Sequence, residues 1–146
     1  MKRLIALCVF LALAACNSQE KYSDFDYSYS RSGGYAPIYE NLWIKGDSAH
    51  YSLEGEGKKV KKDFKLTAQE LKQIDDALAR NNFRMIQEDY KKVYDRVSTA
   101  IYVKKGPESG RKSDASFIME ADKARWDDVV RVFENIIETK VPTASK

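Results

Sequence analysis

The chain has 146 residues, of which 43% are hydrophobic and 32% are charged. This length fits one domain with one hydrophobic core, and the low glycine and proline content fits a folded chain. The 25 lysine and arginine residues nearly balance the 22 aspartate and glutamate residues. No strong positive field therefore favours nucleic acid as a partner.

The first sixteen residues have the layout of a secretory signal. Lys2 and Arg3 precede an apolar run over residues 4–13, and two alanines then lead to Cys16. The run is shorter than the ~20 residues needed to cross a bilayer, so a cleaved signal is predicted rather than a membrane helix. The layout resembles the signal and lipobox of bacterial lipoproteins. The alternative is an ordinary signal peptide in which Cys16 occurs by chance.

The lipoprotein resemblance implies cleavage before Cys16 and attachment of lipid to its thiol, so that the protein's first partner is a membrane. It divides the chain into a signal peptide (1–15), a lipidated tether (16–24) and a single domain (25–141). The other cysteine, Cys8, leaves with the signal, which excludes a disulfide and a thiolate metal site from the mature chain. Asn17 is more compatible with the outer membrane, facing the periplasm, than with the inner membrane, where aspartate at this position retains lipoproteins of enteric bacteria.

Alternating apolar and polar residues predict strands in the first half of the chain. The apolar members of the first alternation are Phe25, Tyr27 and Tyr29. In the second, one side holds Ile38, Glu40, Leu42 and Ile44, and the other holds Tyr39, Asn41, Trp43 and Lys45. Two further strands have apolar sides made of Ala49, Tyr51 and Leu53, and of Val60, Phe64 and Leu66.

Two amphipathic segments predict helices. Thr67 and Glu70 have the spacing of a capping box, and an apolar stripe follows to Arg80. After an exposed connection over residues 87–96, two strands are expected over 97–103 and 111–119. Asp122 is the expected N-cap of a final helix whose apolar residues are Trp126, Val129, Val130, Phe133, Ile136 and Ile137. The order predicts an α+β fold, with an antiparallel sheet of about five to six strands and both helices packed on one face.

The sequence contains none of the common catalytic motifs. It has no HExxH, GxSxG, glycine-rich phosphate loop or CxxC, and its one histidine, His50, is expected on the surface without a partner. The adjacent acids Asp75–Asp76 and Asp127–Asp128 point about 100° apart on a helix, so they are interpreted as solvated faces. No catalytic residue, cofactor or metal is therefore expected, although a carboxylate site of a hydrolase would escape this reasoning.

Two surface features have open interpretations. The lysines of residues 58–62 suit contact with anionic lipid or an acidic partner, and they equally suit an edge strand protected against strand addition. Tyr39 and Trp43 share the side of their strand opposite Ile38 and Leu42. They suit a protein-contact surface, or alternatively cover a second, smaller core under the tether.

Several short motifs resemble the emfourin-like proteins. They are the segment 29–35 with its Ser-Gly-Gly turn, the segment 66–71, the apolar Phe83 after the first helix, the segment 94–96 before a strand, and the last amphipathic helix. Emfourins are small inhibitors of thermolysin-like metallopeptidases, and related domains are widespread without a known role. The resemblance implies that Gly33 and Gly34 form a turn that brings backbone to the surface.

The sequence thus predicts a lipid-anchored, non-catalytic protein-binding module of the bacterial envelope. Its partner would be an envelope protein or a peptidase, and its expected contact residues are Gly33, Gly34, Tyr35, Tyr39 and Trp43. The alternatives are an emfourin-type peptidase inhibitor and an envelope hydrolase with an unrecognised carboxylate site. A deep cleft lined by two acids would favour the hydrolase, whereas a protruding loop at residues 32–37 would favour binding or inhibition.

Overall fold

The computed structural model describes residues 23–142, so the predicted signal peptide and Cys16 lie outside the described residues. The first four strands follow one another along the chain: β1 (Tyr27–Gly33), β2 (Ile38–Lys45), β3 (Ser48–Gly55) and β4 (Lys58–Lys65). The remaining elements are α2 (Ala68–Arg80), η1 (Phe83–Met85), β5 (Val97–Val103), β6 (Gly110–Ser113), η2 (Glu120–Asp122) and α3 (Lys123–Lys140).

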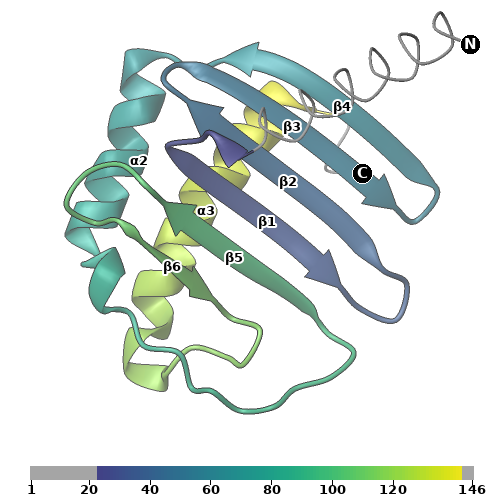
Figure 1. Ribbon diagram of the computed structural model, residues 1–146, viewed down its shortest axis with the longest axis vertical. Helices are drawn as coiled ribbons and strands as arrows, with labels where there is room; N and C mark the ends of the chain where they lie inside the picture. Colours follow the sequence, from purple (N-terminus) through teal and green to yellow (C-terminus); the bar gives the residue numbers. More distant parts are fainter. Residues whose placement is uncertain (1–22, 143–146) are drawn as a thin grey trace, which may run out of the picture.

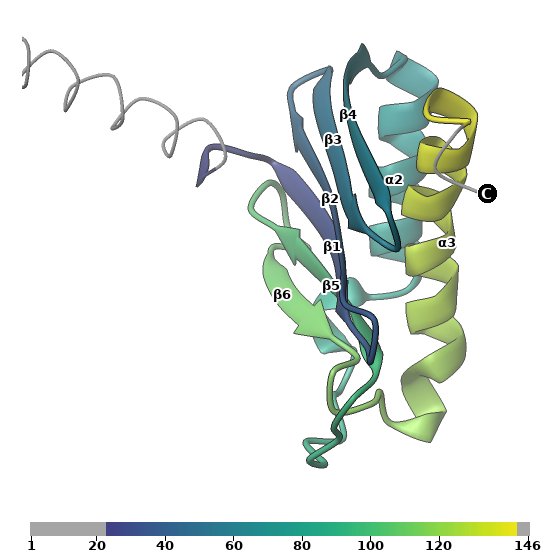
Figure 2. The same ribbon diagram turned by 90° about the vertical axis from the view of Figure 1, so that its right-hand side faces the viewer.

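These elements form two layers. The six strands make one antiparallel sheet in the order β4-β3-β2-β1-β5-β6, and Figure 1 shows β1 near its centre. Figure 2 shows α2 and α3 side by side on one face of the sheet. This arrangement confirms the predicted α+β class, the antiparallel sheet and the packing of both helices on one face.

The core lies between the sheet and the helices. The strand register places Tyr29 beside both Leu42 and Ile101, and Leu42 beside Tyr51, and all four residues are at most 1% exposed. From the helix layer, the ring of Phe133 stacks on Tyr29 with 5.8 Å between centroids and an interplanar angle of 15°. The alternation of the strands and the stripe of α3 therefore meet in one apolar layer, as their periodicities predict.

The start of α2 is fixed by the predicted capping box. The Glu70 amide donates to the Thr67 hydroxyl oxygen at 3.1 Å, and the Thr67 amide donates to the Glu70 carboxylate at 2.7 Å. Lys140, at the end of α3, forms an ion pair with Glu70 at 3.1 Å. At the other end of α2, Asn82 adopts a left-handed conformation (φ +44°), which asparagine tolerates well at the end of a helix.

One prediction about the last third of the chain is wrong, and a second, Asp122 as the N-cap of the last helix, is confirmed in position but not in its hydrogen bond. The strand expected over 111–119 ends at Ser113, because Asp114 turns the chain: its carboxylate accepts from the Thr99 amide at 2.7 Å. Asp122 precedes α3 but makes no capping hydrogen bond. Its carboxylate contacts Arg125 and accepts from the Gln87 amide at 2.8 Å, and these two contacts hold the pKa of Asp122 below its usual value.

Phe25 also departs from its predicted place beside Tyr27. β1 begins at Tyr27, and Phe25 packs edge-on against Tyr102 with ring centroids 5.4 Å apart. Tyr102 alternates with the buried Ile101 and Val103, so its side chain belongs to the face of the sheet away from the helices. Lys104 Nζ lies 4.0 Å from the centroid of the Phe25 ring, and this cation–π contact stabilises the segment that leads into β1.

Candidate functional site

Within residues 23–142, one face of the sheet carries no helix, and we call it the open face (Figure 2). Tyr39 is 56% exposed on this face, whereas Ile38, Leu42 and Ile44 on the opposite side of β2 are at most 8% exposed. The prediction that Tyr39 lies opposite the main core is therefore confirmed. On strands β1 to β4, the side chains that point to the open face include Ser28, Ser30, Ser32, Tyr39, Asn41, Trp43, His50, Ser52, Glu54, Lys59, Lys61 and Asp63.

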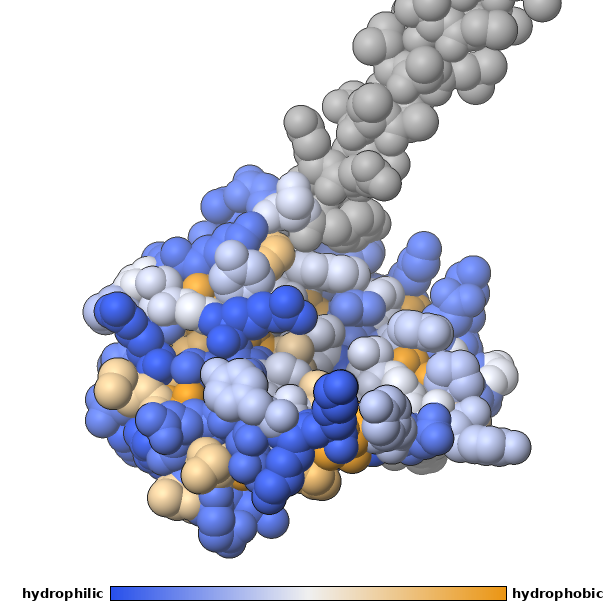
Figure 3. Space-filling view, turned by 60° about the horizontal axis from the view of Figure 1, so that its bottom comes forward, coloured by the Kyte–Doolittle hydropathy of each residue, from blue (hydrophilic) through white to orange (hydrophobic). Residues whose placement is uncertain are grey.

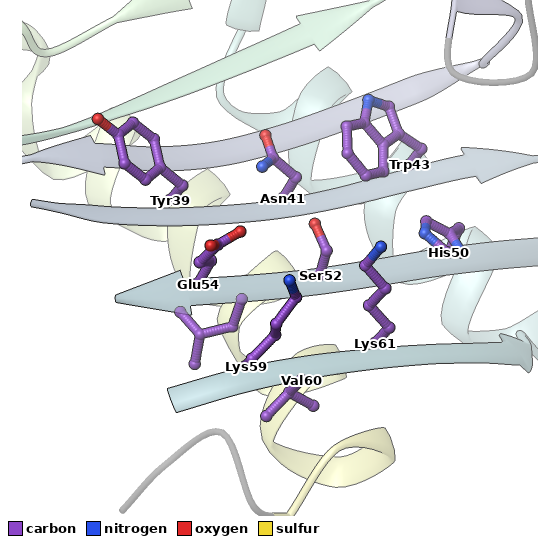
Figure 4. A pocket seen from close by; sticks show the side chains of 10 residues that line it. Tyr39, Asn41, Trp43, His50, Ser52, Glu54, Lys59, Val60 and Lys61 are labelled. Carbon is purple, nitrogen blue, oxygen red and sulfur yellow. The ribbon is translucent and has the colours of Figure 1, made fainter. Parts of the chain in front are cut away.

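The open face contains a shallow depression over β2, β3 and β4. Its floor is a row of polar residues, because the register places Asn41 beside Ser52 and Ser52 beside Lys61. Tyr39 and Trp43 stand on either side of Asn41 along β2, as Figure 4 shows. The hollow has a volume of about 260 Å³. Small side chains between two large aromatic ones therefore create the depression.

His50 and Asp63 support Trp43 from the neighbouring strands. The register pairs Trp43 with His50 and His50 with Asp63. The Trp43 and His50 rings stack with centroids 5.7 Å apart at 27°, and His50 Nδ1 contacts the Asp63 carboxylate. The prediction that His50 has no partner is therefore wrong. This row restricts the orientation of Trp43, which lowers the entropy cost of using it in a contact.

Charge at the depression comes mainly from β4. β4 is an edge strand of the sheet, in agreement with the protective interpretation of its lysines. Lys59 and Lys61 also line the depression, and Glu54 pairs across the strands with Lys59. The depression thus combines aromatic surface with a small excess of positive charge.

The glycine pair lies away from the depression, in the connection from β1 to β2. Gly33 has φ +104°, and a Cβ atom there would lie 2.7 Å from the backbone oxygen of Arg96. A Cβ atom on Gly34 would lie 3.1 Å from a methyl group of Val97. The two glycines therefore allow this turn to pass close to the chain entering β5. Tyr35 in the same turn is 98% exposed, so the predicted contact residues fall into two separate places.

Asp75, Asp76 and Asp127 are exposed, as predicted for solvated helix faces, whereas Asp128 is partly buried. Asp75 and Asp128 also have specific partners. Asp75 accepts from the Tyr27 hydroxyl, and Asp128 accepts from Arg80 at 2.7 Å and from the Asn81 side chain at 2.6 Å. Hydrogen bonds from Asn81 and then Arg80 lower the pKa of Asp128. Within residues 23–142, no group of three His, Cys, Asp or Glu side chains is arranged to hold a metal ion.

Sequence reasoning missed the neighbours of Trp43, although one signal could have found them. Gly46 and Asp47 form a two-residue turn between β2 and β3, and this turn pairs Lys45 with Ser48. Counting back from that pair places His50 beside Trp43 and Ser52 beside Asn41. No comparable signal links Gly33 to Arg96, because Arg96 lies 63 positions further along the sequence.

The fold and this site define a two-layer α+β domain with one open sheet face. No protein-family model matches the sequence, and no curated protein matches it. None of the helices within residues 23–142 is long and apolar enough to cross a membrane.

Proposed function

We propose that this protein is a lipid-anchored protein of the bacterial envelope that binds a protein partner through the depression on the open face. The single observation that supports binding most is the placement of Tyr39 and Trp43 on either side of a polar floor (Figure 4). The lipid anchor rests on the order of residues before Cys16.

The side chains suit a protein contact for physical reasons. Tyrosine and tryptophan offer a large contact area and a polar group, with few rotatable bonds to immobilise. Asn41 and Ser52 each carry side-chain groups that can donate hydrogen bonds to a partner and accept hydrogen bonds from it. Lys59 and Lys61 favour a partner segment that carries carboxylates, because opposite charges speed association and fix its register.

Crosslinking in living cells tests this proposal. A photoreactive amino acid replacing Asn41 should form an adduct with a partner, and the adduct should disappear in the Tyr39→Ala/Trp43→Ala variant. Each truncation is expected to cost about 2 kcal/mol of binding energy, or about thirty-fold in affinity. His50→Ala should weaken capture to a smaller extent, because it removes the ring that stacks on Trp43.

Tyr94→Ala is the matched control, since Tyr94 is 77% exposed outside the depression. It should leave the adduct unchanged. An adduct that persists in the Tyr39→Ala/Trp43→Ala variant would contradict binding through the depression.

The second candidate is an emfourin-type inhibitor of thermolysin-like metallopeptidases. The observation in its favour is the turn at Gly33 and Gly34, to which the resemblance assigns a surface role, because the next residue, Tyr35, is fully exposed. A direct assay distinguishes the two: inhibition of a thermolysin-like peptidase that is lost in Tyr35→Ala, but kept in Tyr39→Ala/Trp43→Ala, would favour this candidate.

A further inference from the structure

A second hollow lies at the end of the sheet opposite the entry of the chain, and we call it the loop pocket. It is formed by the connection before β5, the loop after β6 and the beginning of α3, and its volume is about 450 Å³. Arg96, Phe117, Ile118 and Trp126 are among the residues that line it. Figure 3 brings this end of the molecule forward and shows apolar side chains set among hydrophilic ones.

Arg96 carries a charge that the described part of the chain does not neutralise. Its guanidinium lies 4.3 Å from the centroid of the Phe117 ring, and its Nη1 atom is buried without a hydrogen-bond acceptor. A guanidinium stays charged at any physiological pH, and a buried charged donor without an acceptor costs free energy. Because Arg96 lines the loop pocket, an anion in this hollow would lie beside the guanidinium.

Two of the acids that line the loop pocket, Asp114 and Asp89, are engaged with other groups. The two carboxylate oxygens of Asp114 accept from the Thr99 amide at 2.7 Å and from the Trp126 indole at 3.4 Å. Asp89 forms an ion pair with Lys91 at 2.6 Å. Neither Asp114 nor Asp89 forms an ion pair with Arg96, because each is bound to other donors.

The ring beneath Arg96 is held in a strained backbone conformation. Phe117 has φ +68°, which is unfavourable for a bulky side chain. Its amide donates to the Asp114 carbonyl at 2.9 Å, and its carbonyl accepts from the Asp89 amide at 3.0 Å. Tyr90 (φ +57°) and Asp95 (φ +54°) are also left-handed, in the connection that forms the other wall. Strain of this kind persists where the surrounding structure enforces it, and it is concentrated at binding sites.

We propose that the loop pocket binds a carboxylate attached to an apolar group. Arg96 supplies the positive charge, and Ile118 and Trp126 supply apolar surface beside it. Lys91 and Lys123 also line the pocket, beside the acids Asp89, Asp114, Glu120 and Asp127. These acids repel a doubly charged ligand more strongly than a singly charged one, which favours a carboxylate over a phosphate. The C-terminus of a peptide and a small hydrophobic acid share this chemistry. The proposal is independent of the open face.

A binding titration on the full-length chain in detergent tests the loop pocket. The chain has two tryptophans, so Trp43→Phe leaves Trp126, which lines the pocket, as the fluorescent reporter. The probes are an N-acetylated tripeptide that ends in leucine with a free carboxylate, the same tripeptide as its amide, and phenylacetate. We expect a saturable change in Trp126 fluorescence with the free acid, and at least tenfold weaker binding of the amide.

Variants then assign the effect to Arg96. Arg96→Met keeps an aliphatic chain over Phe117 but removes the charge, and should weaken carboxylate binding at least tenfold. Arg96→Lys keeps the charge without the planar guanidinium and should bind with intermediate affinity. Arg111→Gln, an exposed arginine on β6 outside the pocket, should bind as the parent does.

Binding of the tripeptide alone assigns a peptide C-terminus as the ligand, and binding of phenylacetate assigns a small acid. Three results would each overturn the proposal: no saturable binding of either acid, equal affinity for acid and amide, or undiminished binding by Arg96→Met. The comparison of acid with amide uses the Trp43→Phe chain with Arg96 intact, so it holds even if an Arg96 variant fails to fold.

Discussion

Gly33 and Gly106 both have a positive φ, but only Gly33 lies against another segment of the chain. A Cβ atom at Gly33 would lie 2.7 Å from the Arg96 backbone oxygen, whereas nothing lies within 4 Å of the corresponding position at Gly106. Comparing substitutions at Gly33 and Gly106 therefore separates two contributions to the loss of stability: the unfavourable backbone conformation, which both share, and the steric clash, which only Gly33 has.

We therefore expect Gly33→Ala to destabilise the domain more than Gly106→Ala. The conformational term alone costs about 1 kcal/mol at either site, and the clash should add on the order of 1–3 kcal/mol at Gly33. Urea unfolding of the two variants beside the parent measures the difference. Equal losses would show that the turn can move away from Arg96 without cost.

For single residues, the sequence predicts which side chains are exposed better than it predicts which side chains contact one another. The alternation of β2 correctly separates Tyr39 from the buried Leu42, because burial follows the period of the strand. The alternation of β3 assigns His50 to the same face but does not identify Trp43 and Asp63 beside it. Contacts across strands depend on register, and register has to be counted from the turns.

At the scale of elements, α3 stabilises the fold through one apolar stripe. Phe133 is 1% exposed and stacks on Tyr29 of β1. Of the residues predicted on this stripe, Trp126 and Ile137 are buried, and Val130 is partly buried. The stripe is broad because α3 contacts both the sheet and α2.

Phe133→Ala should therefore cost on the order of 3–5 kcal/mol, since it leaves a cavity and removes the stacking partner of Tyr29. This is a large share of the stability of a small domain. Thermal unfolding followed by circular dichroism gives the result, with Val130→Ala as the control for a smaller, partly exposed side chain. A melting temperature like that of the parent would show that α3 contributes little through this residue.

The elements also show why some predictions failed. Local signals define α2 well, because Thr67 and Glu70 cap it within one turn. They fail at the end of β6, and they do not predict which groups the Asp122 carboxylate binds, because distant partners decide both. Asp114 bonds to Thr99, and Asp122 bonds to Gln87, which lies 35 positions away. The loop pocket arises in this same region, so no local pattern could indicate it.

At the scale of the whole molecule, lipidation at Cys16 predicts that the protein with Cys16 is bound to membranes and the protein without it is not. Cys16→Ser removes the thiol that would carry the lipid, so the variant should leave the membrane fraction or accumulate as an unprocessed precursor. Fractionation in high salt, with an immunoblot of each fraction, makes the comparison, and Cys8→Ser is the matched control because Cys8 lies within the predicted signal. A Cys16→Ser protein that matures and stays bound to membranes would refute lipid anchoring.

The direction of β1 sets how a lipid-anchored domain would be oriented relative to the bilayer. The chain enters the sheet at Tyr27, and β1 then runs seven residues to Gly33, a rise of about 23 Å. With lipid on Cys16, the seven residues 16–22 extend at most about 25 Å. The end of the sheet where the chain enters would then lie nearest the bilayer. The turn at Gly34 and the loop pocket would lie farthest from it. A soluble ligand in the aqueous space would reach the loop pocket first, while an integral membrane protein would meet the lower edge of the sheet.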